Sequence, residues 1–252
     1  EILESGVSPF PDPRFPSDSA RLAALTAPGS EWVLFSEGVR VGRLRADASG
    51  AAQEYCGAPP RVSGVVELVP SAAAAERFLA IPAEDAADLP YGSFAVYTDV
   101  FDQRVAALAI AREAITRNGA IVPSDGVLGI RAETRAFQPV DAATPWVATT
   151  FVNQDQLGLG SPSQGAYGLL VIAQPEGDGF GEAISLFRSV EAEGKGVPQY
   201  HDHMDWDGDG VSEILVDVFG ATRRWFVALD RRDGQWVRSY EDSCGSGARP
   251  TP

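Results

Sequence analysis

Apolar and polar residues alternate along most of this chain, a pattern typical of half-buried β-strands. In the first half, Glu37-Gly38 lies between two alternating stretches and is suited to the turn of a β-hairpin. A short helix is predicted at residues 72–80 and ended by Pro82. The strands predicted in the first half are residues 31–36, 39–46, 61–69 and 94–98.

The second half alternates almost throughout and carries turn sequences at residues 175–179 and 232–234. Short strands joined by such turns favour an antiparallel sheet, a sandwich or part of a propeller. Because no repeat recurs at a period of about 40–60 residues, a full β-propeller is not expected. The strands predicted here are residues 146–152, 167–174, 183–190, 213–219, 223–229 and 235–241.

One main helix is predicted at residues 102–117, with Asp102 as its N-cap and Asn118-Gly119 at its end. This helix is rich in alanine and is expected to pack on a sheet. Its apolar side is expected to carry Val105, Leu108 and Ile115. The predicted fold class is therefore α+β, predominantly antiparallel β with one main helix.

The chain divides by composition into four parts. Residues 1–30 are rich in proline and predict an extended arm, which either lies on its own domain or docks on a partner through Phe10 and Phe15. Residues 31–140 predict an α+β half and residues 141–244 an antiparallel β half, the two forming one compact unit. Residues 245–252 are expected to be a flexible tail.

The charge of the chain excludes some partners. The 252 residues include 35 acidic and 20 basic side chains, a net charge of −15. Binding to nucleic acid needs a cationic face, so no nucleic-acid partner is expected, and an anionic membrane surface is disfavoured for the same reason. The apolar runs are too short for a transmembrane segment.

The two cysteines, Cys56 and Cys244, lie far apart, and no CxxC motif is present for a zinc ribbon or a thioredoxin-type site. They form either a disulfide or two unrelated buried thiols. Their polar, turn-like surroundings favour the disulfide, which implies an oxidising compartment. The chain begins at Glu1 without a signal sequence, as a mature periplasmic or secreted protein would after the signal segment is removed, although a chain cut elsewhere would begin in the same way.

One segment carries recognisable chemistry, because acidic residues alternate around glycine between positions 205 and 213. Such a turn directs its carboxylates toward one centre, and Ca²⁺ prefers six to eight oxygen ligands. The alternative is an acidic β-turn that binds no metal. The expected ligands are the carboxylates of Asp205, Asp207, Asp209 and Glu213 and the main-chain carbonyl of Val211.

The residues after this loop decide which calcium motif it resembles. An EF-hand would place a glutamate where Val216 stands and would continue as a helix, whereas residues 214–219 alternate like a strand. Residues 203–240 are therefore similar to the β-hairpin calcium loop of FG-GAP and integrin-type repeats. That family stacks several repeats into a propeller, but here residues 177–182 are at best a degenerate second copy.

No enzyme motif is apparent in the sequence. A nucleophile elbow, a phosphate-binding loop and a dinucleotide fingerprint are all missing. The two histidines, His201 and His203, are too few for a histidine-rich hydrolase centre and are expected to flank the calcium loop or face solvent. The sequence predicts an exported, calcium-stabilised interaction module or accessory subunit of a larger, possibly membrane, protein complex, docked through the N-terminal arm. The alternative is an extracytoplasmic hydrolase of glycan or peptide with structural calcium.

Overall fold

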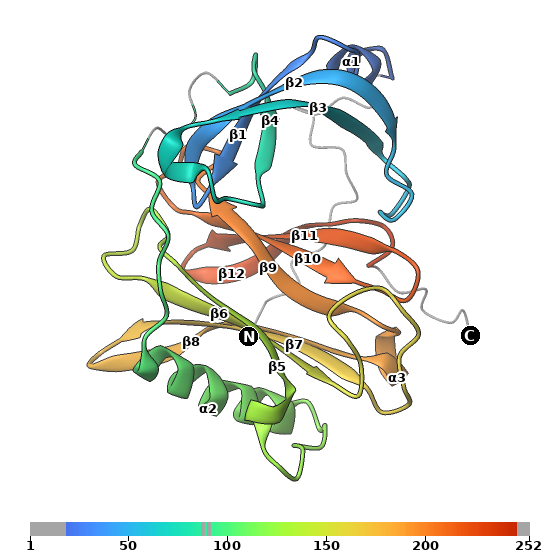
Figure 1. Ribbon diagram of the computed structural model, residues 1–252. Coiled ribbons are helices and arrows are strands. Elements are labelled where there is room, and N and C mark those ends of the chain that lie inside the picture. Colours follow the sequence, from blue (N-terminus) through green and yellow to red (C-terminus); the bar gives the residue numbers. More distant parts are fainter. Residues whose placement is uncertain (1–18, 87–88, 90–91, 246–252) are drawn as a thin grey trace.

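The computed structural model describes residues 19–86, 89 and 92–245. The described strands form three four-stranded antiparallel sheets, stacked with α2 at one end of the stack (Figure 1). This confirms the predicted class, predominantly antiparallel β with one main helix, and none of these three sheets closes into a propeller. The elements are α1 (Ser19–Leu25), β1 (Glu31–Ser36), β2 (Val39–Ala51), β3 (Pro60–Leu68), η1 (Pro70–Ala72), β4 (Leu79–Pro82), α2 (Phe101–Arg117), η2 (Val127–Ile130), β5 (Arg131–Phe137), β6 (Trp146–Asn153), β7 (Tyr167–Glu176), β8 (Gly179–Ser189), α3 (Val190–Glu193), β9 (Val197–Met204), β10 (Glu213–Phe219), β11 (Arg224–Arg232) and β12 (Gln235–Glu241).

We call β1–β4 the N-terminal sheet, β5–β8 the helix-backed sheet and β9–β12 the C-terminal sheet. Their strand orders are β3-β2-β1-β4, β5-β6-β7-β8 and β12-β11-β10-β9. In the last two sheets each strand pairs with the next strand along the chain, so short connections suffice. In Figure 1 the C-terminal sheet lies between the other two sheets.

The main core lies between the helix-backed and C-terminal sheets. β7 is buried on both faces: Leu170 and Ile172 face the C-terminal sheet, while Leu169 and Val171 face α2. Burial on both faces explains why residues 169–173 are continuously apolar rather than alternating. The described side chains that dominate this core are Phe137, Trp146, Leu170, Ile172, Tyr200, Ile214, Val216, Trp225 and Leu229.

The main helix, α2, covers the outer face of the helix-backed sheet. It begins at Phe101, one residue before the predicted N-cap, because Val100 N–H donates a hydrogen bond to Gln103 Oε1 at 2.9 Å. Its buried side is mostly small and consists of Ala107, Ile110, Ala111, Ala114 and Ile115. The predicted apolar side is therefore only partly right, since Val105 is exposed.

The loop between β2 and β3 joins the N-terminal sheet to the C-terminal sheet. Cys56 N–H donates to the Arg224 carbonyl at 2.9 Å, and Arg224 N–H donates to the Glu54 carbonyl at 2.8 Å. The Tyr55 ring stacks on Phe226 at 5.3 Å between centroids. This loop therefore extends the hydrogen bonding of the C-terminal sheet along β11.

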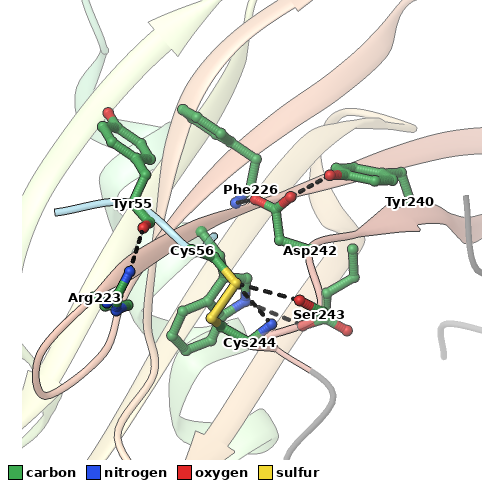
Figure 2. The surroundings of a disulfide bond; sticks show 10 residues. Tyr55, Cys56, Arg223, Phe226, Tyr240, Asp242, Ser243 and Cys244 are labelled. Carbon is green, nitrogen blue, oxygen red and sulfur yellow. Dashed lines mark hydrogen bonds between the residues drawn. A yellow bond between two sulfur atoms is a disulfide. The ribbon is translucent and has the colours of Figure 1, made fainter. Parts of the chain in front are cut away.

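A disulfide between Cys56 and Cys244 fixes the same loop to the segment that follows β12 (Figure 2). The two Cα atoms lie 5.8 Å apart, and Cys244 N–H donates to Cys56 Sγ at 3.1 Å. Arg223 Nη1 donates to the Tyr55 carbonyl nearby at 3.2 Å. The disulfide is thus confirmed, and the reading as two unrelated thiols is wrong.

Several elements differ from the sequence prediction. Residues 72–80 are not a helix, because the segment begins as η1 and ends as β4, which pairs with β1. Residues 94–98 form no strand and contribute only the single bridge from Tyr97 to Ala136. Strands β5 and β9 were not predicted, since charged and polar residues interrupt their alternation. Tertiary pairing outweighs local preference in all these places.

The expected extended arm is also partly wrong. Residues Ser19–Leu25 form α1, because this stretch is rich in alanine and leucine and lies between Pro16 and Pro28. Residues 1–18 and 246–252, which carry the rest of the arm and most of the tail, lie outside the described residues. None of the described helices has the length and hydropathy needed to span a bilayer.

Candidate metal centre and the neighbouring acidic pair

The loop between β9 and β10 gathers the predicted ligand side chains. Met204 at the end of β9 pairs with Glu213 at the start of β10, so residues 205–212 form the loop of this hairpin. One oxygen from each acidic ligand lies within 4.8 Å of the others, a spacing that fits ligands of one ion. The acidic residues brought together are Asp205, Asp207, Asp209 and Glu213.

The main chain of the loop holds these carboxylates in place. Gly208 and Gly210 have φ of +80° and +88°, a region that favours glycine. The Asp205 carboxylate accepts hydrogen bonds from Gly208 N–H at 2.7 Å and from Gly210 N–H at 3.0 Å. The loop is therefore closed around Asp205.

Glu213 differs from the three aspartates because it is buried. Only 2% of the residue is exposed. Its Oε2 accepts a hydrogen bond from Trp206 N–H at 2.9 Å, while its buried Oε1 has no hydrogen-bond partner among the described residues. Burial, helped by the nearby Asp207 carboxylate and opposed by the hydrogen bond from Trp206 N–H, raises the pKa of Glu213 to about 8. A buried, unpartnered carboxylate oxygen is costly unless a cation compensates it.

The ligand set consists of oxygen atoms, which suits a hard cation such as Ca²⁺. Four carboxylates this close repel one another, and a divalent ion would remove that repulsion. The role of the Val211 carbonyl stays a prediction. The Val211 N–H donates to Asp209 Oδ1 at 2.8 Å.

The histidines lie outside this ligand group. His203 is only 1% exposed, which contradicts an exposed position. The buried Tyr200 hydroxyl, whose pKa is raised well above its usual value, lies 2.7 Å from His203 Nδ1, and the Gln138 carbonyl lies 3.0 Å from Nε2. Burial lowers the pKa of His203 to about 4. A neutral ring that accepts from Tyr200 and donates to Gln138 fits these contacts.

A second acidic pair, Glu37 and Asp202, lies where the β1–β2 turn meets β9. Oxygen atoms of the two carboxyls lie within 4.8 Å of each other. Burial is the main cause that raises the pKa of Glu37 to about 7 and that of Asp202 well above its usual value. The Glu37 charge contributes to the rise at Asp202, and the Arg135 charge opposes the rise at both residues. Both residues line a cleft of about 310 Å³.

Sequence reasoning missed this pair because its members are 165 positions apart. The local signals were present: Glu37 lies in a predicted hairpin turn, and Asp202 lies between the two histidines. Neither signal shows that the turn contacts β9, which was itself not predicted.

Comparisons with protein-family models, with curated proteins and with solved structures find no match for this chain.

Proposed function

We propose that this protein is a calcium-stabilised interaction module in which one Ca²⁺ ion closes the β9–β10 hairpin. The observation that carries the proposal is Glu213, whose buried and unpartnered Oε1 belongs to a group of four acidic residues within 4.8 Å. Without a metal, this buried side chain would have to keep a proton, whereas a bound cation would compensate its charge. The proposed ligands are those expected from the sequence, with the Val211 carbonyl as the main-chain ligand.

The ion would stabilise the fold rather than take part in chemistry. Met204 and Ile214, which flank the loop on β9 and β10, are both buried in the core of the protein. Holding Asp205 and Glu213 on one ion therefore fixes the two strands next to the core. The unfolded chain cannot hold these ligands together, so binding adds to the free energy of unfolding.

Two further features support an exported protein with a protein partner. The disulfide is typical of oxidising compartments, which favours a periplasmic or secreted location. β3 is an edge strand that exposes Val65 and Val66, and exposed edges invite pairing with another chain. We propose an accessory role on the extracytoplasmic face of a larger protein complex. Docking through the N-terminal arm concerns residues that lie mostly outside the described part.

The alternative function, a hydrolase of glycan or peptide, would use a pair of acids in a cleft. Glu37 and Asp202 are such a pair, and their raised pKa values favour this alternative. Against it, Glu37 Oε2 and Asp202 Oδ2 are both sealed from solvent. A general acid or base must come within hydrogen-bonding distance of its substrate. The module is therefore the better supported function.

Removal of calcium tests the proposal. With free Ca²⁺ at ten times Kd, binding adds about 1.4 kcal/mol to the free energy of unfolding. For a chain of this size, EGTA should then lower Tm by about 3–5 °C. Asp207→Ala should abolish this response, and Mg²⁺ should restore Tm poorly because it demands a tighter octahedral shell.

Asp178→Ala is the matched control, because Asp178 is an exposed aspartate in the β7–β8 turn and outside the acidic group. This variant should keep the full response to EGTA. If the wild-type melting curve does not move with EGTA, and crystals grown with Ca²⁺ show no ion in the loop, the proposal is wrong.

A further inference from the structure

In the acidic pair at the β1–β2 turn, one carboxyl oxygen already accepts two hydrogen bonds. Asp202 Oδ1 accepts hydrogen bonds from Glu37 N–H at 3.0 Å and from His203 N–H at 2.8 Å. These bonds fix the Asp202 carboxyl against the turn of the N-terminal sheet. Gly38 packs beside the His203 ring, where a Cβ would lie 3.2 Å from Nε2, so the turn and β9 are in close contact.

The other oxygens of the pair are unsatisfied. Asp202 is only 2% exposed, and its Oδ2 has no hydrogen-bond partner within the described part of the chain. Glu37 Oε2 is likewise buried and without a partner there. Two such oxygens, one from each side of a contact between sheets, lack the hydrogen bonds that buried carboxyl oxygens need.

We infer that Glu37 and Asp202 bind a second divalent cation, which joins the N-terminal sheet to β9. Two oxygens that each lie about 2.0–2.6 Å from one ion can be at most about 5 Å apart. One carboxyl oxygen from each residue of this pair meets that condition, since the two lie within 4.8 Å of each other.

The atoms that are available as ligands limit which metal ions can bind here. His203 belongs to the same group of neighbouring side chains, but both its ring nitrogens already contact Tyr200 and Gln138. The site therefore offers oxygen alone, which suits Ca²⁺, Mg²⁺ or Mn²⁺ and disfavours Zn²⁺ or Cu²⁺. An organic amine is a poorer fit, because the unpartnered oxygens are sealed from solvent.

Glu37 and Asp202 both line the cleft, while their unpartnered oxygens are buried beneath its surface. Its wall also carries Arg77 and Arg135, but these guanidinium groups contact Glu133, at 3.1 Å from Arg77 Nη2 and at 3.4 Å from Arg135 Nε. Burial raises the pKa of both Glu37 and Asp202 and the Arg135 charge partly offsets this rise, but no hydrogen bond or ion pair joins either arginine to these carboxyls in the described part of the chain. The two unpartnered oxygens thus remain for a cation.

Metal content measured by dialysis and mass spectrometry tests this inference. All variants are made in the Asp207→Ala protein, in which the proposed calcium loop no longer binds an ion. Any ion that is retained then belongs to the second site. After dialysis against Ca²⁺ or Mn²⁺, this full-length variant should retain one ion per chain. Adding Glu37→Gln or Asp202→Asn should remove that ion, whereas adding Glu76→Gln should not. Glu76 is the matched control, because it lines the same cleft but is exposed.

Melting curves give a second measurement, which still tests the inference if a variant binds ions weakly or folds poorly. In EGTA, Glu37→Gln should be at least as stable as its parent, because it removes one of two facing carboxylates. In Ca²⁺ or Mn²⁺ it should be less stable than its parent, because the cation is lost. The inference is overturned if the Asp207→Ala protein retains no ion, or if Glu37→Gln and Asp202→Asn retain as much as Glu76→Gln. That result would leave the calcium-loop proposal untouched.

Discussion

Asp217 is completely buried on β10 and is paired with the Arg224 guanidinium, which also lies 4.7 Å from the Tyr55 ring. A buried pair of this kind contributes little net stability as a whole, but losing one partner leaves an uncompensated charge in the interior. Arg224 thus links the buried Asp217 to the β2–β3 loop.

Replacing Arg224 by alanine should lower the free energy of unfolding by about 3–5 kcal/mol, because the Asp217 carboxylate stays buried without its partner. Arg232→Ala is the control, since the Arg232 side chain is 61% exposed beside Asp230 and its pair should contribute under about 1 kcal/mol. Urea unfolding followed by tryptophan fluorescence measures both changes. Equal losses in the two variants would contradict this account of Asp217.

The helices, strands and turns that depend only on neighbouring residues can be predicted from the sequence. The β1–β2 turn, the extent of α2 and the hairpins formed by β10, β11 and β12 follow from glycine positions, helix-ending residues and alternation. The acidic loop follows from spacing alone, since its acidic residues are at most eight positions apart. These features need no knowledge of the rest of the fold.

Elements and sites that depend on distant partners could not be predicted in this way. β9 carries Gln199, His201 and Asp202 along its length, so its alternation is hidden, and only pairing with β10 makes it a strand. The buried side of α2 is formed by alanines, because a small side chain lets the helix approach the sheet closely. The pair of Glu37 and Asp202 has the same origin, since it arises from contact between two sheets.

The β3 edge is the element on which the proposed partner would dock. Val66→Lys should abolish co-purification of a protein partner from cross-linked native envelope, because a charged edge strand resists pairing with another chain. Tm should stay unchanged, since Val66 is 48% exposed. Leu128→Lys, at a site on η2 that is 56% exposed, should leave capture intact. Equal capture by both variants would exclude β3 as the docking edge.

The three sheets of the whole molecule are not held together equally. The helix-backed and C-terminal sheets share the large core, whereas the N-terminal sheet packs through two smaller clusters. It meets the rest of the molecule at the Glu37 turn, at the Tyr55 loop, which the disulfide secures, and through a cluster in which Phe35 packs with Met204 of β9. The N-terminal sheet is therefore expected to be the least stable part.

Replacing Cys56 and Cys244 together by serine should lower the free energy of unfolding by about 2–4 kcal/mol. The bond spans 188 positions, so it restricts most of the unfolded chain. Urea unfolding of the double variant measures the loss, and a thiol assay on denatured, unreduced wild-type protein should find no free thiol. Two reactive thiols, or an unchanged free energy of unfolding, would contradict the stabilising role of the bond.

The position of this disulfide also affects what happens when the N-terminal sheet transiently detaches from the other two sheets. The N-terminal sheet is attached to the body by the main chain that leads into α2 and by Cys56, so a sheet that detaches remains tethered at two points. Tethering of this kind holds a detached part at an effective concentration in the millimolar range when the linker is short. Docking of the sheet then behaves as an intramolecular closure, and it does not depend on how dilute the protein is.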